Sequence, residues 1–303
     1  MNFISQIKKQ KNLFLGKIEF DSDLSKYSWF NTGGSAKVIF KPKNLADLSL
    51  FLKNIKGFNK IKIFGRGSNI LIRDGGFDGV VIKLGESFSH MSMFDKNTII
   101  AGSSCLDKKV SHFAYENSLT GFEFLSCIPG TIGGGIRMNS GCYGEDISKV
   151  LLSVQVMDLE GKIRVIKSKE IDFFYRGSNL DNNLVFISAT FKGKKENKSK
   201  IKSKMEKLID KKKKDQPSKI KTCGSTFKNP EGNKAWELIK NSGCAGASLG
   251  DASVSKKHCN FFINKGKARS KDLEDLIYKV KSKVLKDTGI NLELELHIIG
   301  ENL

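Results

Sequence analysis

Four polar side chains of this sequence stand where they could take part in chemistry. Ser225 lies between a glycine and a threonine in a turn-rich segment, where a hydroxyl can be presented without being buried. Arg176 follows three aromatic residues, so we expect its guanidinium to rest partly against an aromatic ring. Glu293 and Glu295 are two residues apart on a predicted strand and therefore point to the same face. Each also has an ordinary interpretation, as a turn, a packing contact, an ion pair or a half-exposed strand, and spacing alone leaves both open.

Residues 128–144 form the most unusual stretch of the chain, because six of these seventeen residues are glycine. Glycine loses more backbone entropy on folding than any other residue, so this density is costly unless the backbone must bend sharply or approach another group. Apolar residues recur between the glycines, which indicates an ordered, buried loop. Such a loop can present bare N–H groups to an anion such as pyrophosphate, or it can be a tight crossover beside a sheet. The glycines are Gly130, Gly133, Gly134, Gly135, Gly141 and Gly144.

A second glycine-rich turn, Gly65-Arg66-Gly67-Ser68-Asn69, is only superficially similar to a dinucleotide-binding fingerprint. The third glycine of that fingerprint is missing, and residues 70–72 are predicted to form a strand where a Rossmann unit requires a helix. The sequence therefore excludes a Rossmann unit here. What remains is a turn at a strand end whose N–H groups and short polar side chains suit a phosphate or a ribose.

The predicted elements around these motifs are of mixed type. Strands are predicted at 35–41, 60–64, 70–72 and 80–84, with a helix after Asn44, its N-cap, which together make a small α/β unit. A strand at 98–105 leads to a helix at 106–117, in which His112 is predicted to be a core or boundary residue. Further strands are predicted at 150–159, 162–166 and 184–191. Helices at 234–242 and 271–288 and a strand at 292–299 complete the chain.

The net charge of +20 invites a nucleic-acid-binding interpretation, but the distribution of lysine argues against it. Much of the lysine lies in Lys192–Lys221, where no aromatic residue is available to stack on bases. Ile201, Met205, Leu208 and Ile209 keep helical spacing in this segment. We therefore expect a helix with a solvated lysine face, ended near Pro217, and no nucleic-acid partner.

Length and composition limit the class of protein. The 303 residues allow two or three domains, and no apolar run reaches the length needed to cross a bilayer. No signal peptide is evident, so we expect a cytosolic protein without membrane insertion. The six cysteines are scattered without a C-x-x-C motif, which predicts neither a metal site nor disulfides but mostly small buried side chains.

Six motifs in this order resemble the family of UDP-N-acetylenolpyruvoylglucosamine reductases, shorter (type II-like) branch, from about residue 25 to residue 301. Any one of them is weak, but six in order with matching gaps are specific. They are Gly65–Asn69, Ile128–Gly134, Met138–Gly144, Tyr175–Ser178, Gly224–Pro230 and Leu292–Glu295.

The resemblance implies an α+β fold in which an FAD-binding module of the vanillyl-alcohol-oxidase (PCMH) type, in two subdomains, is followed by an α+β substrate domain. The expected boundaries are 1–84, 85–195 and 196–303, with the last strand, 291–300, packing back on the FAD module. It implies FAD as cofactor, NADPH as co-substrate, a UDP-sugar as substrate, and a monomer. The cofactor-binding residues that it implies are Gly65, Arg66, Gly67, Ser68, Asn69, Gly130, Thr131, Ile132, Gly133, Gly134, Asn139, Gly141 and Tyr143.

The same resemblance assigns roles in the NADPH-dependent reduction of UDP-N-acetylglucosamine enolpyruvate to UDP-N-acetylmuramate. The proton donor falls on Ser225, and Arg176 and Glu295 flank the substrate. Glu295 is preferred to Glu293 because of its distance from the final Ile-Gly motif. The family's glutamate lies five residues before the glycine of that motif, and Glu295 lies five residues before Gly300. The substrate-binding residues that it implies are Tyr175, Lys228, Asn229 and His258.

Two features depart from the family pattern, and two other functions compete. Gly250-Asp251 stands where a Gly-Gly pair is more usual, and Cys259 replaces a common alanine after His258. A flavoprotein oxidase would share the first two thirds of the chain but not Gly224–Pro230. A basic nucleic-acid-binding protein would be colourless and would show salt-dependent affinity.

Overall fold

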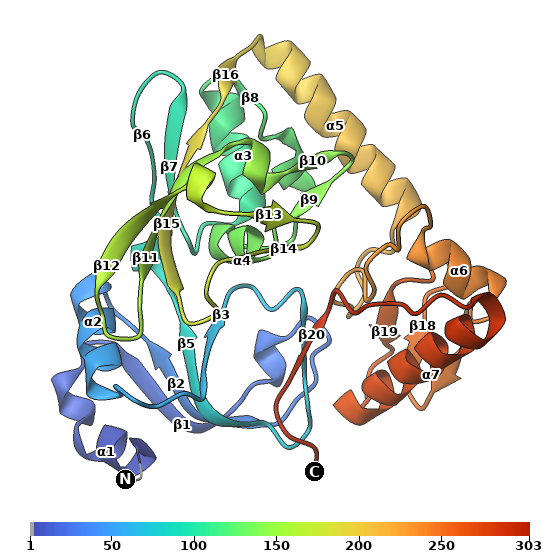
Figure 1. Ribbon diagram of the computed structural model, residues 1–303, viewed down its shortest axis with the longest axis horizontal. Helices are drawn as coiled ribbons and strands as arrows, with labels where there is room; N and C mark the ends of the chain where they lie inside the picture. The colour runs from blue at the N-terminus through green and yellow to red at the C-terminus, as the bar shows by residue number, and fades with distance from the viewer. Residues whose placement is uncertain (1–2) are drawn as a thin grey trace. The chain divides into compact units, whose positions relative to one another are not determined.

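The computed structural model describes residues 3–303, so Met1 and Asn2, at the start of the first predicted subdomain, lie outside the described residues. The chain forms two compact units (Figure 1). Unit 1 comprises residues 1–20, 38–66 and 79–212, and unit 2 comprises residues 21–37, 67–78 and 213–303. Both mix helices and strands. The division of the chain into domains at residues 84 and 195 stays a prediction.

The helices are α1 (Phe3–Lys9), α2 (Leu45–Asn54), α3 (Asp107–Glu116), α4 (Ile132–Arg137), α5 (Lys198–Asp215), α6 (Ala235–Asn241) and α7 (Ser270–Thr288). The strands are β1 (Lys17–Asp23), β2 (Ser35–Lys41), β3 (Ile61–Phe64), β4 (Ile70–Ile72), β5 (Phe77–Lys83), β6 (Met91–Met93), β7 (Thr98–Gly102), β8 (Leu119–Thr120), β9 (Gly141–Cys142), β10 (Glu145–Asp146), β11 (Leu151–Met157), β12 (Ile163–Lys167), β13 (Phe173–Phe174), β14 (Gly177–Ser178), β15 (Val185–Lys192), β16 (Lys194–Lys195), β17 (Ser248–Leu249), β18 (Ala252–Val254), β19 (Phe262–Asn264) and β20 (His297–Ile299).

The first sheet has the strand order β1-β2-β5-β3, with β3 and β5 parallel. Helix α2 begins where predicted, because the Asn44 side chain accepts a hydrogen bond from the backbone N–H of Asp47 at 2.9 Å. Its apolar face buries Phe51, which stacks on Phe40 of β2 with ring centroids 3.9 Å apart. Strand β1 was not predicted, although its Lys-Ile-Glu-Phe alternation is typical of a half-buried strand.

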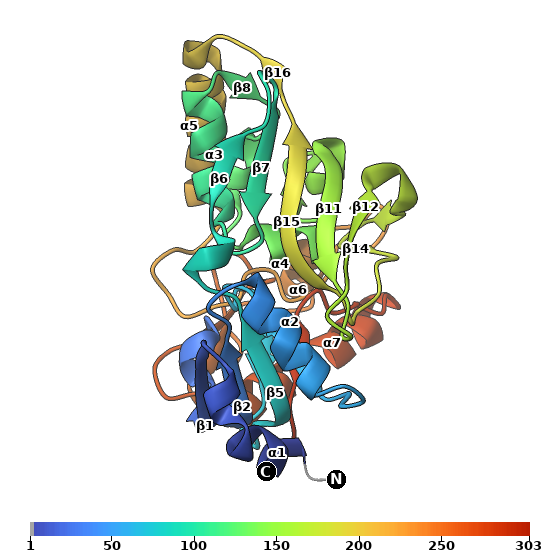
Figure 2. The same cartoon turned by 90° about the vertical axis from the view of Figure 1, so that its left-hand side faces the viewer.

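The second sheet of unit 1 is antiparallel, with the order β12-β11-β15-β7-β6, and Figure 2 shows its strands side by side. The predicted strands at 98–105, 150–159, 162–166 and 184–191 are confirmed as β7, β11, β12 and β15, each ending within three residues of the prediction. Helix α3 and the glycine-rich stretch pack on this sheet through a core that includes Val110, Ile132, Ile136 and Phe191.

Helix α5 confirms the helix predicted in the lysine-rich segment. It runs over Lys198–Asp215 and stops before Pro217. Ile201 is its buried residue, whereas most of its lysines are exposed. The apolar residues at helical spacing therefore place one side of α5 against the rest of unit 1, and the lysine-bearing side of α5 remains in solvent.

Helix α3 is confirmed, but the prediction for His112 is wrong. The His112 side chain is 67% exposed and its Nε2 lies 3.6 Å from a carboxylate oxygen of Glu116, one turn further along the helix. The buried ionisable residue of this helix is Asp107, its first residue, which is fully buried. Neither carboxylate oxygen of Asp107 has a hydrogen-bond partner in the described part of the chain, and burial raises its pKa to about 8.

We expect the substitution Asp107→Asn to stabilise the protein in a pH-dependent way. The folded pKa lies above the usual value of 3.8, so the folded protein binds more protons than the unfolded chain between about pH 4 and pH 8. The contribution of Asp107 to the free energy of unfolding therefore falls as the pH rises through that window. Asparagine cannot ionise, so the variant should exceed the parent by at least about 1 kcal/mol at pH 8 and by less at pH 5.

Urea unfolding of both proteins at the two pH values measures this difference. Asp95→Asn is the matched control. Hydrogen bonds from Asn97 and Thr98 lower the pKa of the exposed Asp95 carboxyl. The Asp95 carboxylate therefore stabilises the folded protein at pH values above that pKa. That variant should lose stability at pH 8. A gain for Asp107→Asn that does not change with pH would contradict the interpretation.

Unit 2 is assembled around helix α7, which packs on α6 and on the sheet β17-β18-β19. The helices predicted at 234–242 and 271–288 are confirmed as α6 and α7. The strand predicted at 292–299 is confirmed only for its last three residues, which form β20 and pair in parallel with β4. Residues 292–296 make isolated backbone contacts with residues 226–228 instead of a regular ladder, because their neighbour is itself irregular.

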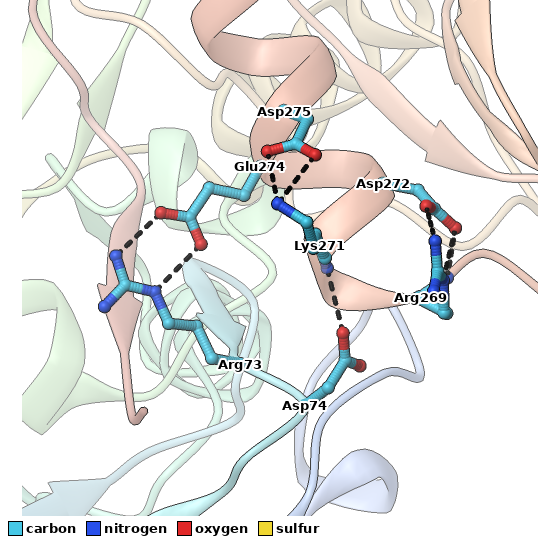
Figure 3. A network of polar contacts seen from close by, with 7 residues as sticks. All are labelled: Arg73, Asp74, Arg269, Lys271, Asp272, Glu274 and Asp275. Carbon is cyan, nitrogen blue, oxygen red and sulfur yellow. Dashed lines mark hydrogen bonds and ion pairs between the residues drawn. The ribbon is translucent and has the colours of Figure 1, made fainter. Parts of the chain in front are cut away.

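Figure 3 shows how residues 73 and 74 are bound to the start of α7 within unit 2. The Arg73 guanidinium donates two hydrogen bonds to the Glu274 carboxylate, at 2.8 and 2.7 Å. The Asp74 carboxylate accepts hydrogen bonds from the backbone N–H groups of Ser270 and Lys271, each at 3.0 Å, and so caps the helix. The turn that carries Gly67–Asn69 therefore belongs to the same unit as the C-terminal third of the chain.

Candidate active site

The glycine-rich stretch contains a short helix, α4, in place of the continuous loop that was expected. Ile132 and Ile136 are buried one turn apart, and the glycines let the helix backbone lie close to its neighbours. A Cβ atom at Gly133 would meet Ser103 at 3.1 Å, and one at Gly135 would meet Ile147 at 2.5 Å. Close packing beside the sheet therefore explains two of the glycines.

Gly65 and Arg66, the part of the turn Gly65–Asn69 that belongs to unit 1, lie near this stretch. A Cβ atom at Gly65 would be 2.7 Å from the Thr131 hydroxyl, so only glycine allows this approach. The Lys83 amine donates a hydrogen bond to the Gly65 carbonyl. Burial, together with the nearby charges of Arg66 and Lys41, lowers the pKa of Lys83 to about 8. Gly65, Arg66, Thr131 and Lys83 thus form one polar, cationic group.

The predicted cofactor-binding residues at the other end of the stretch are held by local contacts. The Asn139 side chain is buried, donates to the Phe174 carbonyl at 3.3 Å and accepts from the Ser148 backbone N–H at 3.1 Å. Gly141 allows the tight β9-β10 hairpin, since a Cβ atom there would be 2.2 Å from the Glu145 carbonyl. The Lys211 amine lies 4.8 Å from the centre of the Tyr143 ring.

Arg176 lies in the two-residue turn between β13 and β14, still within unit 1. Its backbone φ is 60°, a left-handed conformation that non-glycine residues adopt rarely and mostly at functional or strained positions. Its guanidinium carbon lies 4.8 Å from the centre of the Tyr175 ring, which confirms the predicted contact with an aromatic face. The Tyr175 side chain is exposed.

Ser225 belongs to unit 2, where its segment is held by backbone contacts on both sides. It forms a bridge with Phe261, and the next residue but one, Phe227, forms a bridge with Leu294. Ser225 is half-buried, and its hydroxyl makes no hydrogen bond within residues 3–303. The turn-stabilising role that the sequence left open would require such a bond, so the geometry favours a hydroxyl presented to a ligand.

Glu295 and Asn69 lie beside this segment. The backbone N–H of Glu295 donates to the Thr226 carbonyl at 2.9 Å, and the Glu295 carbonyl accepts from the Asn69 side chain at 2.9 Å. Glu293 is more exposed, at 73%, and its carboxylate lies 3.4 Å from the Lys228 amine. Unit 2 therefore brings Asn69, Ser225 and Glu295 together, whereas Arg176 belongs to unit 1.

The other predicted substrate-binding residues of unit 2 have structural contacts as well. The Asn229 side chain accepts from the backbone N–H of Ala235 at the start of α6, at 3.0 Å. The His258 ring lies between Trp236 and Phe261, with centroid distances of 5.9 and 4.8 Å. Burial lowers the pKa of His258, which keeps the imidazole neutral at pH 7.

The sequence analysis missed Asn260, which fixes the Ser225 segment. Its amide donates to the Phe227 carbonyl at 2.8 Å and accepts from the Phe227 N–H at 2.9 Å, while its carbonyl accepts from the Thr226 N–H at 2.8 Å. Lys83 was also missed. The sequence offered one indication of each residue, which is a polar side chain inside an apolar run: Asn260 before Phe261–Ile263, and Lys83 after Val80–Ile82.

Comparison with known proteins agrees with this arrangement. Residues 36–167 match the family described as FAD binding domain, and residues 216–299 match UDP-N-acetylenolpyruvoylglucosamine reductase, C-terminal domain. The chain is 52% identical to the UDP-N-acetylenolpyruvoylglucosamine reductase of Pelagibacter ubique, covering 98% of this chain and 99% of that one. These matches define an FAD-containing oxidoreductase with the predicted α+β fold. The chain belongs to the UDP-N-acetylenolpyruvoylglucosamine reductase family.

Two further comparisons span almost the whole chain. The reductase of Rickettsia prowazekii is 46% identical and covers 94% of this chain and 97% of its own. The crystal structure of the reductase from Thermus caldophilus superposes with a TM-score of 0.82 at 29% identity, covering 94% of this chain and 99% of that one. FAD as the cofactor is thereby confirmed, while the roles of individual residues stay predictions.

The residues of unit 1 fit a dinucleotide cofactor. Gly65 offers an unobstructed backbone beside Thr131, and the charges nearest to Lys83 are both positive, as expected where an anionic group is to be bound. Within residues 3–303 no group of His, Cys, Asp and Glu side chains could hold a metal ion. In the same residues no helix is long and apolar enough to cross a membrane.

Proposed function

We propose that this protein catalyses the NADPH-dependent reduction of UDP-N-acetylglucosamine enolpyruvate to UDP-N-acetylmuramate, a step of peptidoglycan synthesis, as a cytosolic monomer. When bound, FAD would supply the redox chemistry, the transfer of a hydride from NADPH to the terminal carbon of the enolpyruvyl group. The names of the relatives and their full-length similarity support this reaction.

In this proposal three residues of the chain act in the reaction itself, and four others bind the substrate. Hydride addition to the terminal carbon pushes electrons toward the substrate carboxylate, and the Arg176 guanidinium stabilises the negative charge that develops there. The Ser225 hydroxyl gives a proton to the adjacent carbon. Glu295 orients the site or returns the proton to Ser225. Tyr175, Lys228, Asn229 and His258 bind the substrate, with Lys228 on the diphosphate.

The observation that carries the proposal is the state of Ser225. Ser225 is half-buried and its hydroxyl lacks a hydrogen-bond partner within the described residues, while Ser225 itself forms a backbone bridge with Phe261 and Asn260 fixes the two residues that follow. A weak acid such as a serine hydroxyl can serve as a proton donor only to a strongly basic carbon held within hydrogen-bond reach. A fixed, unpaired hydroxyl meets that requirement.

Two half-reactions test the proposal. The purified protein should be yellow, NADPH should bleach the flavin without oxygen, and UDP-N-acetylglucosamine enolpyruvate should restore the colour. Reoxidation by oxygen with release of peroxide, and none by the UDP-sugar, would favour an oxidase instead. A colourless protein with steeply salt-dependent affinity for DNA or RNA would favour a nucleic-acid-binding function.

Lys83 gives a prediction about the binding of FAD to the apoprotein. A neighbouring diphosphate raises the pKa of a buried lysine from its present value of about 8, so at pH 9 binding should take up a proton. Calorimetry at pH 9 in two buffers of different ionisation enthalpy measures this uptake. At pH 7 the amine is already protonated and the uptake should vanish. Lys83→Met should abolish the uptake at pH 9, whereas Lys62→Met, on an exposed face of β3, should leave it intact.

A further inference from the structure

Cys127 and Cys142 lie together although fourteen residues separate them in the chain. Cys127 is the last residue of a short 3-10 helix, η4 (Glu123–Cys127), and immediately precedes the glycine-rich stretch. Cys142, in β9 near the end of that stretch, donates a hydrogen bond from its thiol to the Phe124 carbonyl of η4 at 3.5 Å. The Cys142 thiol therefore lies against the helix that ends in Cys127, and each of the two thiols affects the pKa of the other.

Polar groups around the pair distinguish the two thiols. The Ser126 hydroxyl lies 3.8 Å from the Cys127 sulfur, and the Lys212 amine donates to the Cys127 carbonyl at 2.6 Å. The hydrogen bond with Cys142 comes first among the causes that lower the pKa of Cys127 to about 6, and Ser126 and Lys212 add to it. The pKa of Cys142 is raised by the same hydrogen bond and by burial. The two thiols are therefore unequal, and Cys127 has the greater thiolate character.

Cys127 differs from the other four cysteines in the direction of its pKa shift. Cys105, Cys223, Cys244 and Cys259 are buried, as Cys127 is, but burial is the largest influence on their pKa values and raises each of them. Cys244 and Cys259 have the same sequence separation as Cys127 and Cys142. Sequence spacing alone thus does not distinguish the two pairs, whereas the interaction between the Cys127 and Cys142 side chains does.

We propose that Cys127 and Cys142 form a reversible dithiol–disulfide site that reacts with low-molecular-weight disulfides. The Cys127 thiolate attacks one sulfur of the disulfide, forming a mixed disulfide and releasing a thiolate. The Cys142 thiol then gives up its proton, attacks the Cys127 sulfur and expels the second thiolate. The protein loses two electrons and the Cys142 proton, and the small disulfide is reduced to one thiol and one thiolate, which takes its proton from water.

The bridge would close a loop that contains Gly130, Gly133, Gly134, Asn139 and Gly141. On the proposed cofactor-binding role of these residues, it ties both ends of the FAD-binding stretch together and slows release of the flavin. The site also lies beside Arg176, whose charge acts on the Cys142 thiol. A bond at this position links the redox state of the surroundings to the proposed active site.

Oxidised glutathione and the holoenzyme test the bond itself. After treatment at pH 7, free thiols are blocked with N-ethylmaleimide, and the digested protein is analysed by mass spectrometry. We expect one peptide pair joined through Cys127 and Cys142, reversible by dithiothreitol, with the other four cysteines blocked. A bridge between any other cysteines, or six blocked thiols, would overturn the proposal.

Single variants separate the two steps. Cys142→Ser should stop at a glutathione adduct on Cys127, and Cys127→Ser should give neither adduct nor bridge. Cys244→Ser is the matched control and should form the bridge at the parent rate. Lys212→Gln keeps both thiols and should slow bridge formation about tenfold, because a weaker thiolate character slows attack. An unchanged rate in Lys212→Gln would remove the lysine from the site.

Flavin release on dilution tests the consequence for the cofactor. The oxidised parent should release flavin more slowly than the reduced parent, and Cys142→Ser should show no such dependence on glutathione. Equal release from both forms would overturn control of the cofactor while leaving the disulfide in place. Loss of the NADPH and UDP-sugar reactions would overturn the proposed function without affecting the mass-spectrometric result.

Discussion

Ser225→Ala should leave reduction of the flavin by NADPH unchanged and slow its reoxidation by the enolpyruvyl substrate at least about 10³-fold, near the upper part of the range for a positioned general acid. The physical reason is that the hydride step creates a carbanionic centre that must be protonated, and alanine has no proton to give. Stopped-flow absorbance of the flavin measures the two half-reactions separately, each without interference from the other.

Ser218→Ala is the matched control for this variant. It removes an exposed hydroxyl of the same unit, past the end of α5, and should change neither half-reaction. Because Ser225 sits between two backbone bridges, its variant should retain the flavin content and thermal midpoint of the parent. An equal loss in both half-reactions would exclude Ser225 as the proton donor.

Arg176→Lys should slow reoxidation by the substrate by about 10²- to 10³-fold, the loss typical of removing one group that stabilises developing negative charge. Lysine keeps the positive charge but cannot offer two parallel N–H groups to a carboxylate, nor lie flat on the Tyr175 ring at the observed 4.8 Å. Single-turnover reoxidation of the prereduced protein gives this rate directly.

Arg164→Lys provides the comparison, since Arg164 is exposed on β12 of the same unit. That variant should reoxidise at the parent rate. If Arg176→Lys also turned over normally, Arg176 would have no part in charge stabilisation, and its left-handed backbone would need another explanation.

Local patterns in the sequence were enough to predict most elements, and the family resemblance carried by the six motifs implied the cofactor. The four apolar residues at helical spacing in the lysine-rich segment predicted α5, and the strand-like residues 70–72 correctly excluded a Rossmann unit. The alternation of Leu and Glu over 292–296 was misleading. An alternating pattern reports which side chains face inward, but a regular strand also needs a regular neighbour, and residues 226–228 are not one.

What the sequence could not predict depends on contacts between distant segments. Asp107 and His112 share one helix, yet the carboxylate is buried and the imidazole is exposed, because the glycine-rich stretch covers the helix start. Lys83 becomes part of a cationic group only through the turn at Gly65, and Asn260 acquires its role only where Phe227 returns beside it. No window of neighbouring residues contains these pairs.

The parallel pairing of β20 with β4 has a consequence for biosynthesis. Ile72 of β4 pairs with Ile299 of β20, which is among the last residues to leave the ribosome. The four-stranded and five-stranded sheets consist of residues made before position 193, so they can form while translation continues. By contrast, the hydrogen bond between Asn69 and Glu295 cannot form until Glu295 has been made. The same holds for the backbone contacts that residues 293–296 make with the segment after Ser225. A newly made enzyme can therefore mature only after termination, and a chain cut short by ten residues would retain unit 1 and lack the strand that completes unit 2.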